Sequence, residues 1–423
     1  MKKKNQLKIK RKNIEFFLEK QPSKLASVTL FLPGGTFYEP FNQKNISHLA
    51  EHLITLTPHA GKNYADWRHN YYQKYKLKVE AYTYKDHVAI TVSSPSSTFK
   101  IALNYLFNNW LNQDISNKDF QRAKNTVISE ELQYCDYPVN QSIDKFNKVY
   151  GGDRKLFIDS FEKLKSSDKA TVDQVRNYLA WTYNSDQTKV SVCGNIDFHL
   201  MKDYIKNINI PQVNSDFKPN RFKYQDIKKD KELSSITVVE NGLLNLNYIV
   251  MGFYSIEDYD PQIKLLFMLL HSAFREFVNL YFLSTGLSYT FKTGLEVMPC
   301  NSWLKTYLQV NPVQVELMLG NIIKELNKFK NEIGIYKMSK EKLIEFFVKP
   351  SVTYRTNALC EMMYYNYQPL SLSDTLTRID FITYSHYKQF IDRIIRRINL
   401  KILFYGKIKG NEVDLSRAIK LLD

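Results

Sequence analysis

Residues 47–59 read SHLAEHLITLTPH, and within them His48 to His52 form the pattern H-x-x-E-H. On an α-helix, residues four apart leave the same face one turn apart, so His48 and His52 can offer two imidazole nitrogens to one Zn²⁺. Glu51 projects from the same side, where a carboxylate can take a proton from water without being a ligand. The apolar residues of the stretch fall on a separate face at helical spacing: Ile46, Leu49, Ala50, Leu53 and Leu56.

Two histidines and a glutamate also fit a solvated helix face, so a metal site needs a third ligand. In residues 119–138, DFQRAKNTVISEELQYCDYP, the acidic candidates Glu130 and Glu131 are adjacent. At 100° per residue Glu131 lies near the middle of the apolar stripe and Glu130 lies towards its edge. A carboxylate in an apolar face is unfavourable unless it is paired or metal-bound. Glu131 is therefore the predicted third ligand, with Glu130 and a buried salt bridge as the alternatives.

Composition narrows the possible classes of protein. The chain has 423 residues, a formal charge of +16, 29 Tyr and 26 Phe. Part of the charge lies in the basic N-terminus, which predicts a solvated tail, and we do not expect this tail to contact a membrane. The sequence has no zinc-finger or RNA-binding signature that would indicate binding to nucleic acid. The four cysteines are far apart in sequence, which favours isolated thiols in a reducing compartment. With no signal peptide or long apolar run, we expect a cytoplasmic protein.

Along the chain, the order strand, long helix, β-hairpin, helices and strand occurs twice. TKVSVCGNI at 188–196 resembles LKILFYGKI at 400–408, and each closes its half. This repeat predicts an α+β fold of two similar domains, each a mostly antiparallel sheet with helices packed on one face. The predicted division is an N-terminal domain at 1–210, a polar linker at 211–235 and a C-terminal domain without a metal site at 236–423.

The stretch GGTFYEPFNQKNISHLAEHL resembles the opening of the pitrilysin, insulysin and mitochondrial-processing-peptidase family, and VISEELQ resembles the helix that completes that family's zinc site. The resemblance spans essentially the whole chain and suggests a half-size bacterial type. It implies a zinc metalloendopeptidase in which His48, His52 and Glu131 bind Zn²⁺ and Glu51 acts as the general base. EAYT at 80–83 and GLSYTF at 286–291 resemble substrate-contacting segments, which implies roles in substrate binding for Glu80, Ala81 and Tyr289.

Three departures from the family pattern qualify these expectations. Lys124 stands where a carboxylate often supports the metal ligand, Glu80 replaces an asparagine, and Leu283 replaces an arginine. The resemblance still implies a peptide substrate, such as a leader or bacteriocin-like precursor, and a homodimer or a heterodimer with a related chain. The alternative is a non-catalytic or weakly active partner subunit of a heterodimeric peptidase.

Overall fold

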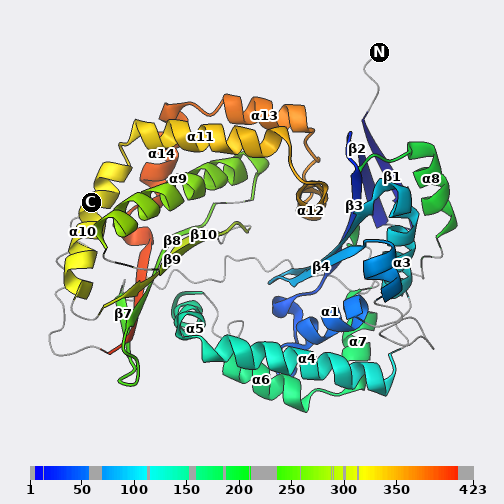
Figure 1. The fold of residues 1–423 in the computed structure, drawn as a ribbon, viewed down its shortest axis with the longest axis horizontal. Helices are drawn as coiled ribbons and strands as arrows, with labels where there is room; N and C mark the ends of the chain where they lie inside the picture. The colour runs from blue at the N-terminus through cyan, green and yellow to red at the C-terminus, as the bar shows by residue number, and fades with distance from the viewer. Residues whose placement is uncertain are drawn as a thin grey trace. The chain divides into compact units, whose positions relative to one another are not determined.

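In the computed structural model the chain forms two compact units, each built around one sheet (Figure 1). The structure describes residues 5–12, 14–56, 69–111, 115–151, 159–183, 187–208, 210, 236–257, 259–286, 288, 290–298, 302–311 and 314–407. The first unit comprises residues 1–133, 160–221 and 350–371, and the second comprises residues 134–159, 222–349 and 372–423. Both units thus collect segments from distant parts of the sequence.

The first unit is organised by a six-stranded sheet in the order β1-β2-β6-β3-β5-β4. All neighbouring strands are antiparallel except β2 and β6, which are parallel. The strands are β1 (Gln6–Arg11), β2 (Ile14–Lys20), β3 (Leu25–Pro33), β4 (Lys78–Thr83), β5 (His87–Pro95) and β6 (Lys189–Gly194). Because β4 pairs with β5 alone, it forms one edge of the sheet.

Helices of the first unit bury the apolar side of this sheet. Every second residue of β3, from Ala26 to Leu32, points to one face of the sheet and packs in the same core as the apolar face of α1 (Ile46–Leu56). The helical spacing of the apolar residues in α1 predicts this face. The helices here are α1 (Ile46–Leu56), α3 (Phe99–Leu111), most of α4 (Asn117–Asp136), α6 (Ser160–Lys169), α7 (Val172–Thr182) and α8 (Phe198–Asn207), with short turns η1 (Thr36–Tyr38), η2 (His69–Lys74) and η3 (Ser96–Thr98).

The second unit has a five-stranded sheet in the order β7-β11-β8-β10-β9, in which only β7 and β11 are parallel. Its strands are β7 (Ile236–Glu240), β8 (Asn247–Ser255), β9 (Thr290–Glu296), β10 (Ser302–Val310) and β11 (Leu400–Gly406). Its helical elements are α5 (Pro138–Tyr150), α9 (Pro261–Thr285), α10 (Val315–Phe329), α11 (Ile333–Val348), α13 (Leu372–Asp380), α14 (Tyr384–Ile394) and η6 (Arg397–Asn399).

The predicted internal repeat is visible in the two strand orders. Removal of β1 leaves β2-β6-β3-β5-β4, which matches β7-β11-β8-β10-β9 position by position, including the single parallel pair. The two similar closing segments of the sequence are β6 and β11, and they occupy the same place in their sheets. The predicted α+β fold with two similar sheets and packed helices is confirmed.

One helix from each half of the sequence belongs to the other half's unit. Helix α5 packs against Val250 and Leu403 of the second sheet, although it precedes the predicted linker. Helix α12 (Val352–Tyr364) packs on Phe17, Phe31 and Ala89, on the face of the first sheet opposite α3 (Figure 1). The compact units therefore differ from a continuous division into 1–210 and 236–423, because each sheet has a second apolar face that a helix from the other half covers.

The predicted linker at 211–235 and Tyr289 lie outside the described residues. Among the residues that the structure does describe, no helix has both the length and the apolar character needed to cross a bilayer.

Candidate active site

The start of α1 is held by a buried carboxylate from the preceding loop. Glu39 Oε2 accepts a hydrogen bond from the backbone nitrogen of Asn45 at 2.9 Å, and Oε1 accepts one from that of Ser47 at 3.1 Å. The Ser47 hydroxyl also donates to Glu39. The two carboxyl oxygens of Glu39 thus satisfy backbone N–H groups at the start of the helix that have no partner within it. The side chain of Asn45 donates instead to Glu131 and Ser167, and Glu39 provides the cap.

Three side-chain atoms converge beside α1 and form a near-equilateral triangle. His48 Nε2 and His52 Nε2 are 3.1 Å apart, and Glu130 Oε2 lies 3.3 Å from the first and 3.2 Å from the second. Neighbouring ligands of a tetrahedral Zn²⁺ with bonds of about 2.0–2.1 Å are separated by roughly 3.3 Å. The triangle therefore has the size and the nitrogen and oxygen donors that one zinc ion requires.

Glu131 occupies a different place from the one the sequence suggested. It is buried, as the helical stripe predicts, while the Glu130 side chain is 48% exposed. Glu131 Oε1 lies 3.5 Å from His48 Nδ1 and accepts a hydrogen bond from Asn45 Nδ2 at 3.1 Å. It thus contacts the nitrogen of His48 that faces away from the triangle. A carboxylate beside that nitrogen can orient the imidazole ring.

The support around the two histidines is uneven. Glu131 serves the outer nitrogen of His48, but Nδ1 of His52 is buried without a hydrogen-bond partner among the described residues. Ring nitrogens of metal-bound histidines usually donate to a carboxylate or a carbonyl. Only His48 has a carboxylate beside its outer nitrogen here.

The electrostatics of the triangle favour a cation. Burial by itself lowers the pKa of His48, but hydrogen bonds to Glu130 and Glu131 outweigh it and raise this pKa to about 9. Hydrogen bonds to His48 and His52 hold the pKa of Glu130 well below its ordinary value. The glutamates therefore create a local potential that stabilises positive charge between the two helices.

Glu51 is buried next to the triangle and its orientation is fixed by the edge strand. Its Oε2 accepts a hydrogen bond from the Thr83 hydroxyl at 2.7 Å. Thr83 is the last residue of β4 and of the quartet EAYT, from which only Glu80 and Ala81 were singled out by sequence. The alternation of side chains along a strand could have identified Thr83, because Val79, Ala81 and Thr83 share the face that looks at α1.

The other predicted residues have less direct relations to this site. Glu80 and Ala81 lie on β4, where Glu80 forms an ion pair with Lys78 at 2.6 Å and Ala81 packs against the core. Lys124 donates hydrogen bonds to the carbonyl oxygens of Asp168 and Ala170, so its charge is directed at the end of α6. It does not contact the three converging groups.

Comparisons with known sequences identify the family of the chain. A sequence profile described as "Insulinase (Peptidase family M16)" matches residues 16–146, and one described as "Peptidase M16 inactive domain" matches residues 169–343. Together they cover most of the chain, which belongs to the M16 insulinase family of peptidases. The curated relative "Uncharacterized zinc protease YmxG" of Bacillus subtilis (strain 168) is 23% identical over 197 residues. These residues are 46% of this chain and 47% of the relative, so the match spans about half the length of each.

Solved structures confirm the architecture of the whole chain. A peptidase M16 inactive domain from Pseudomonas fluorescens is 14% identical with a TM-score of 0.81, over 96% of this chain and 100% of that one. A protease from Helicobacter pylori is 13% identical with a TM-score of 0.73, over 95% and 99% of the two chains. At such low identity these likenesses show the fold alone.

Proposed function

We propose that this chain is a zinc-dependent endopeptidase, with His48, His52 and Glu130 as the metal ligands and Glu51 as the general base. The observation that carries the proposal is the triangle of donor atoms, 3.1–3.3 Å on each side, with a buried carboxylate directly beside it. In this proposal Glu130 takes the role that the sequence suggested for Glu131, and Glu131 orients His48. The half-exposed Glu130 leaves this side of the site open to solvent and to a substrate.

Zinc bound here would polarise the scissile carbonyl and lower the pKa of a water molecule. Glu51 accepts the proton of the attacking water and later returns it to the leaving amine. The Thr83 hydroxyl donates to Oε2 of Glu51, so Oε1 would be the oxygen that accepts the proton. A peptide could add as an extra strand to the free edge of β4, near Glu80 and Ala81.

The test is a pair of neighbouring substitutions on one helix, Glu130→Gln and Glu131→Gln. Zinc content after dialysis, measured by mass spectrometry of the metal, should fall most in Glu130→Gln, while Glu131→Gln should retain zinc at reduced affinity. Glu51→Gln should keep the zinc and lose cleavage of a quenched fluorescent peptide. If Glu131→Gln loses zinc and Glu130→Gln does not, the assignment of the ligands is reversed.

The second candidate is a partner subunit without activity of its own. It is favoured by the matches to one profile and one solved structure described as an M16 inactive domain, and by Leu283 in place of an arginine. Identical behaviour of wild type and Glu51→Gln on a broad peptide panel would support it. Cleavage that appears only when a related chain is added would support a heterodimer, and the mass of the purified protein in solution would separate a homodimer from a monomer.

A further inference from the structure

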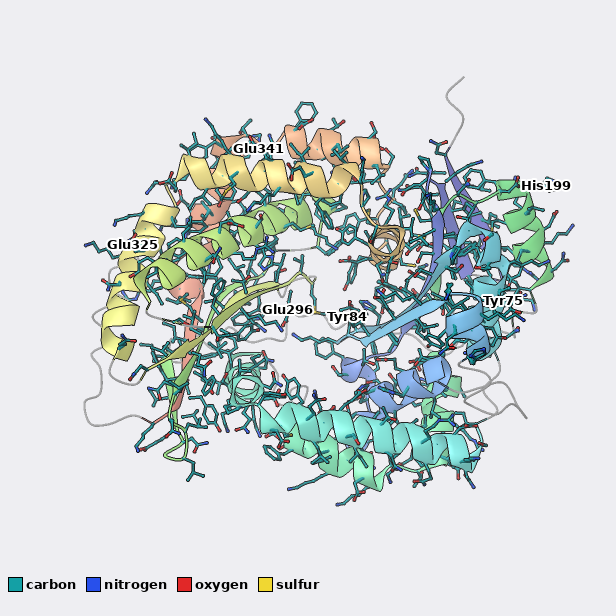
Figure 2. The ribbon with its side chains drawn as sticks, in the orientation of Figure 1. Tyr75, Tyr84, His199, Glu296, Glu325 and Glu341 are labelled. Carbon is teal, nitrogen blue, oxygen red and sulfur yellow. The ribbon has the colours of Figure 1, made fainter. Side chains whose placement is uncertain are left out.

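The turn between β4 and β5 lies where three parts of the first unit meet, and the proposed mechanism has not used it. It consists of Tyr84, Lys85 and Asp86 and directly follows Thr83, the residue that binds Glu51. The backbone nitrogen of Tyr84 donates to the carbonyl of His87 at 2.9 Å, which closes the hairpin. The imidazole of His87 stacks between Phe31 and Tyr84, with ring centroids 4.3 and 4.6 Å away; Figure 2 labels Tyr84 at the end of β4.

One side of this turn is held by the end of α12. The Tyr364 hydroxyl donates to the backbone carbonyl of Asp86 at 2.7 Å. The Tyr365 hydroxyl donates to Asp86 Oδ2 at 3.0 Å, while Oδ1 of the same carboxylate lies 2.8 Å from His87 Nδ1. Two neighbouring tyrosines thus bind both the backbone and the side chain of one turn residue.

The other side of the turn carries the loop that begins α1. The backbone nitrogens of Thr36 and Phe37 donate to the carbonyls of Tyr84 and Lys85 at 3.1 and 2.8 Å. The same loop continues to Glu39, which caps the helix that carries the histidines. The position of the turn therefore fixes both the strand end that orients Glu51 and the loop that anchors the zinc helix.

We propose that Thr83 is a positioning residue for Glu51, and that Tyr364 and Tyr365, at the C-terminal end of α12, are positioning residues that act through the 84–86 turn. This inference rests on the proposed function, since it concerns the orientation of the proposed general base. It assigns a catalytic influence to residues about 280 positions after Asp86 in the sequence, none of which touches the metal ligands. If α12 had only a structural role, changes in it would lower the stability of the first sheet without a selective loss of kcat.

The first experiment exchanges the hydroxyl of Thr83 in the full-length chain. Thr83→Val keeps the shape and removes the donor, whereas Thr83→Ser keeps the donor. On a quenched fluorescent peptide, kcat of Thr83→Val should fall on the order of tenfold, with KM and zinc content unchanged, because one hydrogen bond to a charged group is lost. Thr83→Ser should restore most of kcat. Equal kcat in wild type and Thr83→Val would overturn the role of Thr83.

The second experiment removes the two hydroxyls of α12. Tyr364→Phe combined with Tyr365→Phe should lower kcat roughly two- to tenfold and speed hydrogen–deuterium exchange of the backbone amides at 78–87. Tyr204→Phe is the matched control, because its hydroxyl donates to Asn104 at 2.9 Å on a different helix pair. If exchange at 78–87 does not change, α12 does not hold the turn.

These readouts separate the inference from the proposed function. A wild-type protein without zinc-dependent hydrolysis would refute the proposed function and the catalytic effect of Thr83 together, while the exchange measurement would still decide whether α12 holds the turn. The two sets of changes are then combined in one protein. If its loss of kcat, expressed as a free energy, equals the sum of the losses in the tyrosine double variant and in Thr83→Val, the tyrosines and Thr83 act separately. Non-additive losses support one path through the turn.

Discussion

Removal of Arg355 should destabilise the first unit more than any other single polar change on α12. Its guanidinium binds Glu19 side-on, with Nε 2.7 Å from Oε1 and Nη2 2.5 Å from Oε2. The two side chains are only 1% and 5% exposed. Arg355 also donates to the carbonyl of Leu370, at the end of the segment that joins the first unit. Through these contacts Arg355 holds both α12 and the segment that follows it, at Leu370, against strand β2, which carries Glu19.

The magnitude follows from the charge that Arg355→Met would leave behind. Breaking a buried ion pair by removal of one partner costs about 3–5 kcal/mol, since the remaining charge is buried without compensation. Gln6 and Gln21 each donate to Glu19 at 2.7 Å and would still do so, which places the expected loss near 3 kcal/mol. For a unit of about 150–250 residues, such a loss lowers the melting temperature by roughly 6–12 °C.

Thermal unfolding followed by calorimetry or by intrinsic fluorescence measures this loss. The matched variant replaces both partners, Glu19→Leu with Arg355→Met, so that no charge stays buried; most of the lost stability should return. A shift of less than about 2 °C in Arg355→Met, or a double variant as unstable as the single one, would show that packing of α12 and not its ion pair holds the segment.

Three further predictions concern other parts of the first unit. Gly35→Ala should destabilise the protein by about 1–3 kcal/mol and lower activity, because Gly35 has φ +82° and a Cβ would overlap the Tyr84 carbonyl; Gly242→Ala, with nothing within 4 Å, is the control in the same melting assay. Burial raises the pKa of the Cys360 thiol to about 12, so iodoacetamide at pH 8 should leave it unmodified in native protein and alkylate it after unfolding, as peptide mass mapping would show. Burial also raises the pKa of Glu39 above its ordinary 4.5. The contribution of Glu39 to the free energy of unfolding is therefore complete below the pKa that this group has in the unfolded chain, and it is lost as the pH rises through its pKa in the folded protein. Chemical denaturation at a series of pH values from 4 to 7 should show this loss in the wild type and not in Glu39→Gln.

The helix that carries His48 and His52 and the succession of elements along the chain could be predicted from the sequence, because their signals are local. Alternation marks β3 and β5, and helical spacing marks α1, so each could be placed without its partners. The burial of Glu131 was also correctly anticipated from the α4 stripe. Burial, however, does not identify a ligand. Glu130 lies at the edge of the apolar stripe, and its Oε2 is 3.3 and 3.2 Å from Nε2 of His48 and His52.

The sequence could not show that α5 and α12 each belong to the unit of the other half of the chain, because this depends on which sheet face each helix covers. Helix α12 has apolar residues such as Leu359 and Met363 that would fit many sheets. Its polar residues make the choice specific: the Ser191 hydroxyl donates to the carbonyl of Thr356 at 2.6 Å, and Asn357 donates to Thr91 at 3.1 Å. Such pairings involve residues more than 160 positions apart and leave no periodic pattern in either segment.

This long-range closure has a consequence for how the site must be assembled. All the groups proposed for chemistry lie before residue 132, yet among the described residues it is the segment 350–371 that packs on the second face of their sheet. A fragment that ends before α12 would expose Phe17, Phe31 and Ala89 to water and leave Glu19 buried without Arg355. Bringing such distant segments together costs loop-closure entropy, which the contacts of α12 must offset. The proposed metal ligands and general base thus belong to a unit whose sheet needs residues 350–371 on its second face, so any peptidase activity should require the chain through α12.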